Sequence, residues 1–85
     1  MTKIVIYSKE QCPYCHMAKD LLKSRGLTFE EIRIDLDDSK REEMLRLTNN
    51  RRTVPQIFIN NTLIGGYDDL SALANSGELD KLIGA

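Results

Sequence analysis

The stretch Ile4-Val5-Ile6-Tyr7, followed after a short polar loop by Cys12-Pro13-Tyr14-Cys15, decides the fold of this 85-residue chain. The apolar run is typical of a strand buried on both faces, and a helical pattern of apolar residues follows Cys15. Pro13 suits the first position of a helix, where its missing N–H is no loss, so Cys12 is the predicted N-cap. Helix amides and the helix dipole favour a thiolate there, which makes Cys12 the candidate nucleophile. Cys15, three residues later on the same face, lies within disulfide reach as its partner.

Composition narrows the classes of partner. Twelve Lys and Arg against thirteen Asp and Glu leave a formal net charge of −1, so no basic excess points to nucleic acid. The first residues resemble no secretory leader, and no apolar run has the length of a membrane span. Two closely spaced cysteines fit a working thiol pair better than a secreted disulfide framework. We therefore expect one cytoplasmic domain over residues 1–85, with no membrane contact.

After the cysteines, the spacing of apolar residues along the chain alternates between that of a helix and that of a strand. The first helix is expected to run to Arg25 and to stop at Gly26, and a second strand is expected over residues 29–34. Ser39 and Glu42 match a capping box, which predicts a second helix starting at Ser39. That helix is expected to carry three apolar side chains inward and to end at Asn49-Asn50; they are Met44, Leu45 and Leu47.

The second half of the chain predicts a hairpin and a third helix. Two short apolar strands, residues 56–59 and 62–64, flank Asn60-Asn61, whose residues tolerate the positive φ of a two-residue turn. Gly65-Gly66 is expected to break the strand, and Asp68 or Asp69 to cap the third helix. Leu79, Leu82 and Ile83 suggest a last helical turn.

A helix between the first two strands makes those strands parallel, and the hairpin adds two more. The predicted fold is therefore α/β, a four-stranded mixed sheet flanked by helices with the thioredoxin-like layout. Three segments in this order resemble the signature of small bacterial dithiol glutaredoxins over essentially the whole chain. These segments are Cys12-Pro13-Tyr14-Cys15, Thr53-Val54-Pro55 and Gly65-Gly66-Tyr67-Asp68-Asp69-Leu70. Thioredoxins differ, because they carry Trp-Cys-Gly-Pro-Cys and this chain has no tryptophan.

The resemblance implies a glutathione-dependent thiol-disulfide oxidoreductase. In such an enzyme Cys12 attacks a disulfide or a glutathionylated thiol, and Cys15 or a second glutathione resolves the mixed disulfide. Glutathione is then a co-substrate, and neither a metal nor a tightly bound cofactor is required. The implied partners are disulfide-containing or glutathionylated proteins, with ribonucleotide reductase as a family-level expectation, and a monomer is expected. The resemblance also implies that Pro55 is cis and lies against the cysteines.

The residues themselves suit glutathione, a short extended peptide with two carboxylates and one ammonium. Pro55 offers no N–H, so the backbone of Val54 is free to pair with such a peptide. The Gly66 turn allows close approach of one carboxylate to helix amides, and Asp68 can accept from the ammonium unless it is a plain N-cap. The candidate binding residues are Lys9, Tyr14, Arg52, Thr53, Val54, Pro55, Gly66, Tyr67 and Asp68.

Basic residues near the cysteines have two candidate roles. Lys9 is a cation three residues before Cys12 and can lower the pKa of its thiol. Lys9 or Arg52 can hold the glycine carboxylate of glutathione. Adjacent residues face different ways, so only one of Arg51 and Arg52 is expected to line the groove.

The same cysteine motif is compatible with other kinds of site. Cys12 to His16 also matches covalent haem attachment, which needs an exported chain and a second axial ligand. A structural zinc site needs four ligands, and the chain has two cysteines and one histidine. Two further alternatives are a reductant that takes electrons from a flavoprotein reductase, and an iron-sulfur carrier that holds a cluster between two monomers through Cys12 and glutathione.

Overall fold

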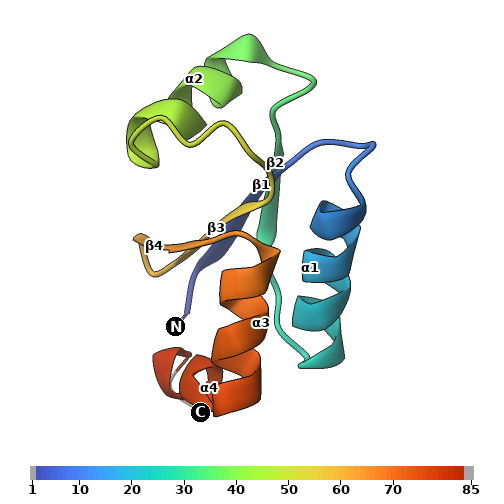
Figure 1. The fold of residues 1–85 in the computed structure, drawn as a ribbon, viewed down its shortest axis with the longest axis vertical. Helices are drawn as coiled ribbons and strands as arrows, with labels where there is room; N and C mark the ends of the chain where they lie inside the picture. The colour runs from blue at the N-terminus through green and yellow to red at the C-terminus, as the bar shows by residue number, and fades with distance from the viewer. Residues whose placement is uncertain (1, 84–85) are drawn as a thin grey trace.

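Four strands form one mixed sheet in the computed structural model, which describes residues 2–83 (Figure 1). The strand order is β2-β1-β3-β4, with β1 parallel to β2 and antiparallel to β3, and β3 antiparallel to β4. The predicted topology is therefore confirmed. The elements are β1 (Ile4–Ser8), α1 (Pro13–Ser24), β2 (Glu30–Arg33), α2 (Asp38–Leu47), β3 (Gln56–Ile59), β4 (Thr62–Gly65), α3 (Tyr67–Ser76) and α4 (Glu78–Leu82).

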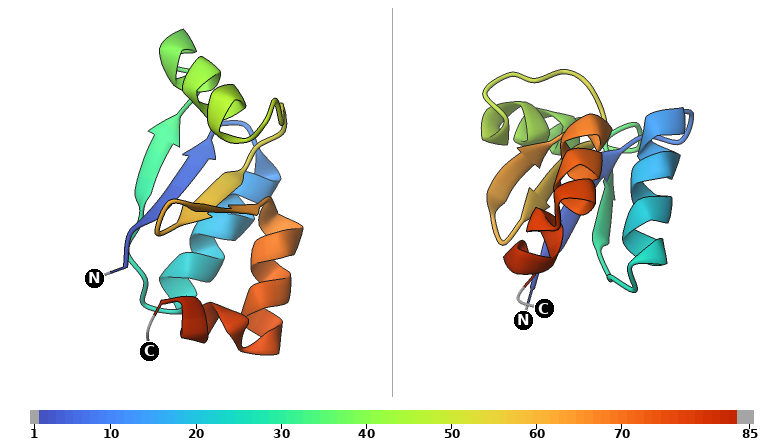
Figure 2. Two further views of the ribbon diagram at one scale, coloured as in Figure 1. Left: turned by 90° about the vertical axis from the view of Figure 1, so that its left-hand side faces the viewer. Right: turned by 60° about the horizontal axis from the view of Figure 1, so that its bottom comes forward.

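Helices α1 and α3 cover one face of this sheet, and α2 packs on part of the other. On one face, Ile6 and Ile57 of the sheet pack with Leu22 of α1 and Leu70 of α3 in the larger apolar core. On the other face, Met44 of α2 packs in a smaller core, whose remaining buried residues are Tyr7, Ile34 and Phe58. Figure 2 shows α2 near the ends at which β1 and β2 stop, away from α1 and α3. Within residues 2–83, no helix is long and apolar enough to cross a membrane.

The hairpin between β3 and β4 follows the prediction. Asn60 and Asn61 have φ values of 50° and 67°, as the two central residues of a tight hairpin turn require. The Asn60 side chain accepts from the Lys3 amide at 2.9 Å, and the Asn60 amide donates to the Lys3 carbonyl at 2.8 Å. The turn is therefore tied to the start of β1.

The predicted start of the second helix is wrong. Asp37, not Ser39, is the N-cap of α2, and its carboxylate accepts from the Ser39 amide at 2.9 Å and the Ser39 hydroxyl at 2.7 Å. These bonds, with those from the backbone, lower the pKa of the Asp37 carboxyl. The Ser39 hydroxyl, which an N-cap would use to accept from a helix amide, instead donates to Asp37. Ser39 is the second residue of the helix.

The inward face of α2 also differs from the prediction at Leu47. Met44 is fully buried and Leu45 is half-buried, whereas Leu47 is 48% exposed. The residue one turn after Met44 is Thr48, which is 2% exposed. Since residues four apart share a helix face, Met44 and Thr48 define the buried face and Leu47 lies beside it.

The third helix begins earlier than predicted. Its N-cap is Gly66, so neither Asp68 nor Asp69 caps it in the expected way. Instead the Asp69 carboxylate accepts from the Gly66 amide at 3.1 Å, the reciprocal half of a capping box. Gly65, expected to break the strand, is the last residue of β4 and has a φ of 120°.

Candidate active site

The two cysteines lie at the start of α1, directly after the loop that follows β1. Cys12 is the extended N-cap residue and Pro13 is the first helical residue, as predicted. The Cys15 amide donates to Cys12 Sγ at 3.2 Å, and the Cys12 thiol donates to the Val54 carbonyl at 3.6 Å. The helix terminus therefore supplies an N–H to this sulfur, as expected for an N-cap position.

The two thiols differ in burial. Cys12 is 7% exposed, whereas Cys15 is fully buried. Burial, together with a hydrogen bond to Cys12, raises the pKa of the Cys15 thiol well above its ordinary value. Of the two sulfurs, Cys12 is thus the one that an incoming disulfide can reach, and Cys15 stays protonated beneath it.

A depression of about 560 Å³ opens directly beside Cys12. Its walls include Lys9 of the loop before α1, Arg41 of α2 and Arg52 of the segment before β3. Asp35 also lines it, but Arg33 binds that carboxylate at 2.6 and 2.7 Å and holds its pKa well below its usual range. The three cations therefore give this side of the site a positive character.

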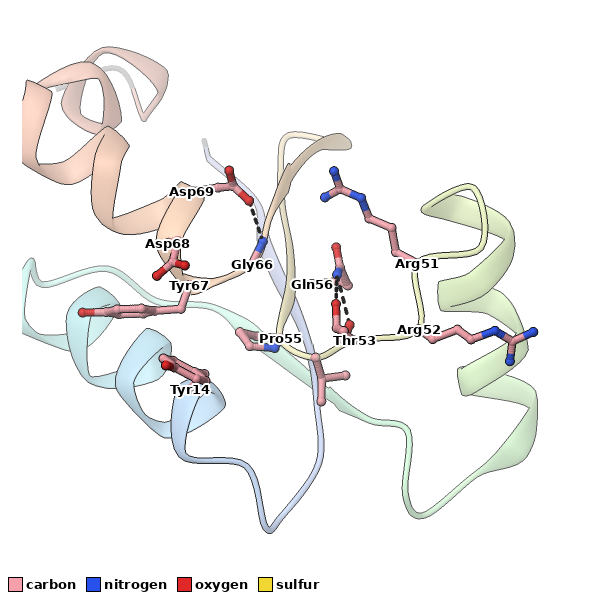
Figure 3. Close-up of a pocket in the computed structure, with 11 residues that line it drawn as sticks. Tyr14, Arg51, Arg52, Thr53, Pro55, Gln56, Gly66, Tyr67, Asp68 and Asp69 are labelled. Atoms are coloured by element: carbon pink, nitrogen blue, oxygen red, sulfur yellow. Dashed lines mark hydrogen bonds between the residues drawn. The ribbon is translucent and has the colours of Figure 1, made fainter.

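A second depression, of about 580 Å³, shares Arg52, Thr53 and Val54 with the first (Figure 3). It brings together residues from α1, the segment before β3 and the start of α3. The lining residues are Tyr14, Arg51, Arg52, Thr53, Val54, Pro55, Gln56, Gly66, Tyr67, Asp68 and Asp69. Every candidate glutathione-binding residue except Lys9 is among them, and Lys9 lines the first depression.

Particular features of this second depression match the sequence analysis. The Val54–Pro55 peptide bond is cis, as the resemblance implied. The rings of Tyr14 and Tyr67 lie 6.1 Å apart between centroids and form one wall. His16, by contrast, is exposed, and its Nε2 lies 2.9 Å from the Glu10 carbonyl oxygen.

The expectation that only one of the two adjacent arginines lines the groove is wrong. Arg51 and Arg52 point in different directions, as expected, yet both line the second depression (Figure 3). The groove is wide enough that one side chain lies toward Asp69 and the other toward α2. Arg52 alone of the two also lines the depression beside Cys12.

Within residues 2–83, no cluster of three or more His, Cys, Asp or Glu side chains is arranged to hold a metal ion.

Comparison with known proteins identifies the family. The family profile for glutaredoxin matches residues 4–64. The chain belongs to the glutaredoxin family.

Individual glutaredoxins match over nearly the full length. Glutaredoxin 3 of Escherichia coli strain K12 is 54% identical over 83 residues, covering 98% of this chain and 99% of that protein. The solution structure of a glutaredoxin from Brucella melitensis has a TM-score of 0.84 at 43% identity, covering 98% of this chain and 89% of that one. The crystal structure of a buckwheat glutaredoxin-glutathione complex has a TM-score of 0.87 at 30% identity, covering 98% of this chain and 77% of that one.

These relatives establish the fold as thioredoxin-like and the activity as that of the family. The chain is a glutathione-dependent thiol-disulfide oxidoreductase, and its two cysteines are the redox-active dithiol pair.

A charged group of this glutaredoxin ties β1 to α1 and β2. Glu31 Oε2 accepts from the Ser8 hydroxyl at 2.5 Å and from Lys19 Nζ at 2.9 Å. Burial favours the protonated carboxyl, but these bonds outweigh it and lower the Glu31 pKa. Ser8 precedes the active-site loop and Lys19 follows Cys15 by one turn, so the group braces both ends of the segment.

Sequence reasoning missed two residues of the second depression. Asp69 lines the groove, although its place in the sequence predicted only a helix cap. Gln56 also lines it and is 2% exposed. A polar residue that opens an otherwise apolar strand directly after Pro55 was the available signal for Gln56.

Proposed function

We propose that Cys12 carries the reaction as nucleophile and that glutathione is its co-substrate. The Cys12 thiolate attacks the glutathione sulfur of a protein mixed disulfide, forms a Cys12-glutathione disulfide, and releases the protein as a thiolate that takes up a proton. A second glutathione thiolate then attacks that sulfur, which yields oxidised glutathione and regenerates the Cys12 thiolate. The observation that carries this assignment is the 3.2 Å hydrogen bond from the helix amide of Cys15 to Cys12 Sγ.

Cys15 is proposed as the resolving thiol for protein disulfides. After Cys12 has attacked such a disulfide, Cys15 gives up its proton and attacks Cys12 Sγ as a thiolate. The substrate's second sulfur leaves and takes up that proton, and a Cys12–Cys15 disulfide remains. Its full burial and raised pKa support a thiol that stays protonated until a mixed disulfide forms above it.

Glutathione is proposed to lie across Val54. The backbone of Val54 pairs with the peptide as a short added strand, since Pro55 has no N–H to compete. The γ-glutamyl carboxylate meets the amides at the start of α3 near Gly66, and Asp68 accepts from the ammonium. At the other end, Lys9 and Arg52 hold the glycine carboxylate, supported by the positive character of the depression beside Cys12.

The remaining candidate residues shape the groove. Tyr14 and Tyr67 are proposed to wall the γ-glutamyl end, and Thr53 to present its backbone beside Val54. The ring separation of 6.1 Å supports a shared wall.

The proposed physiological partners are glutathionylated and disulfide-containing proteins in the cytoplasm, with ribonucleotide reductase as one family-level expectation. We propose that residues 1–85 form a single glutaredoxin domain that acts as a monomer. No tightly bound cofactor takes part in the exchange chemistry as written, because thiols alone carry the electrons.

The test compares two variants on two substrates, a glutathionylated cysteine peptide and a protein disulfide. The assay couples glutathione to glutathione reductase and NADPH. Cys12→Ser should abolish turnover of both substrates, whereas Cys15→Ser should keep turnover of the peptide and lose part of the activity on the protein disulfide.

Equal loss in both variants on the peptide would contradict the division of labour between the cysteines. A parallel assay with thioredoxin reductase in place of glutathione tests the other electron source. Turnover that needs only thioredoxin reductase would contradict the proposed use of glutathione.

A further inference from the structure

Gln56 is a buried polar residue with one satisfied and one unsatisfied end. It opens β3 and is 2% exposed, although the rest of that strand is apolar. Its Nε2 donates to the Thr53 carbonyl at 3.0 Å and contacts the Thr53 hydroxyl at 3.2 Å. Its Oε1 is buried with no hydrogen-bond partner (Figure 3). The side chain therefore makes its bonds entirely to one residue of the binding segment.

The carboxamide orientation is fixed by chemistry. Exchanging the oxygen and nitrogen of Gln56 would set its carbonyl against the Thr53 carbonyl, and two acceptors cannot bond to each other. The unpartnered oxygen is thus a consequence of the contact with Thr53. A buried acceptor without a partner destabilises a fold, so packing and stability alone do not account for an amide here.

We infer that Gln56 is a positioning residue that holds the Thr53–Val54 peptide in the orientation that glutathione needs. The inference rests on the proposed pairing of Val54 with glutathione. Thr53, held by the carboxamide, directly precedes Val54, and Val54 is also the residue whose carbonyl accepts from the Cys12 thiol. The carboxamide contact with Thr53 therefore orders the edge of the groove, residues Thr53 and Val54, which lies next to Cys12.

Loss of this contact should weaken binding rather than chemistry. Thr53 is exposed, so water can replace the bonds from Gln56 and the segment gains freedom instead of collapsing. Glutathione must then order the edge on binding, which costs affinity. Once glutathione is bound, the Cys12 sulfur and its helix amide are as in the wild type, so the maximal rate is retained.

The experiment replaces Gln56 by methionine, which has a similar length and no polar end. Gln56→Met should raise the KM for a glutathionylated cysteine peptide about threefold to tenfold, the size of one or two net hydrogen bonds, with kcat unchanged. The melting temperature should stay equal or rise, because the unpartnered oxygen is removed. The NMR order parameter of the Val54 amide should fall, as expected for a more mobile segment, while that of Phe58 is unchanged.

The matched control is Ile57→Met, a similar change at the next buried position of β3. It should alter neither the KM nor the Val54 order parameter, since Ile57 faces the larger core.

A Gln56→Met protein with wild-type KM and a wild-type Val54 order parameter would overturn the inference. A KM increase accompanied by a fall in both kcat and melting temperature would also overturn it, because that pattern marks a structural defect. If the wild-type protein does not use glutathione, the proposed function fails, and the Val54 order parameter alone still decides whether Gln56 orders the Thr53–Val54 segment.

Discussion

At the scale of single residues, the structure distinguishes two alternative roles that the sequence left open for Asp68. An aspartate near a helix start is either an N-cap or a ligand contact. The N-cap of α3 is Gly66, and the capping carboxylate that reaches back to it belongs to Asp69. Asp68 is exposed and lines the groove beside Tyr67. Its carboxylate therefore has no capping role, which supports the proposed contact with the ammonium of glutathione.

Asp68→Asn should raise the KM for a glutathionylated peptide about threefold to tenfold, as for a charged hydrogen bond at an exposed site. Steady-state kinetics and a melting curve check this, and the melting temperature should hardly change. Asp68→Ala should behave in the same way, because no cap is lost. A wild-type KM for the asparagine variant beside a raised KM for the alanine variant would show that charge is not what Asp68 contributes.

At the scale of elements, the junction of β4 and α3 depends on a glycine. Gly65 has a φ of 120°, and a Cβ added there would lie 2.2 Å from Asp69 Oδ2 and 3.1 Å from Arg51 Nη1. The absence of a side chain thus lets Asp69 reach the Gly66 amide. Since the start of α3 borders the groove, this junction supports the candidate site.

Gly65→Ala should lower the free energy of unfolding by about 2–4 kcal/mol, from backbone strain plus the lost capping bond. The matched control is Gly26→Ala, where φ is 70° and a Cβ meets nothing within 4 Å. Strain alone acts there, so about 1–2 kcal/mol is expected. Urea unfolding of both variants provides the measurement, and equal losses would show that the Asp69 contact adds nothing.

Most elements were predictable because their signals are local. Pro13 after Cys12 set the start of α1, and the pair Asn60-Asn61 set the hairpin turn. The error at the start of α2 falls where a neighbour competes for a polar group. Asp37 takes the Ser39 hydroxyl that a capping box at Ser39 required. Such competition depends on side-chain geometry, which spacing alone does not contain.

At the scale of the whole molecule, the site joins segments that only the sheet brings together. Val54 meets Cys12 because β3 pairs with β1, and Asp68 reaches the groove because β4 follows β3. The sequence predicted these residues largely through the family resemblance, since spacing gives no distance between residues 42 apart. Gln56 was missed because its role depends on burial and on an unpartnered oxygen, which appear only in the folded chain.

The stability of the whole reduced protein should depend on pH through the buried Cys15 thiol. Its pKa is raised in the folded state above the ordinary value of 9.0, chiefly by burial. Below pH 9 both folded and unfolded chains keep this proton, so its stabilising effect is fully present. Above pH 9 the unfolded chain loses the proton first, and the free energy of unfolding falls as pH rises toward the folded pKa.

Cys15→Ala isolates this effect, since it removes the titrating group. Between pH 8 and pH 10, the wild-type protein should lose about 1.4 kcal/mol more than the variant, because the unfolded chain releases this proton around pH 9 and the folded chain keeps it. Tyr7, whose pKa is also raised by burial and by its bond to Glu43, adds a decline in the same direction to both proteins and cancels in the difference. Urea unfolding with a phosphine reductant measures the free energy of unfolding of the wild-type protein and of the variant at each pH. Identical pH dependence would mean that Cys15 ionises as readily in the folded chain as in the unfolded one, and would remove the support that its raised pKa gives to the resolving role.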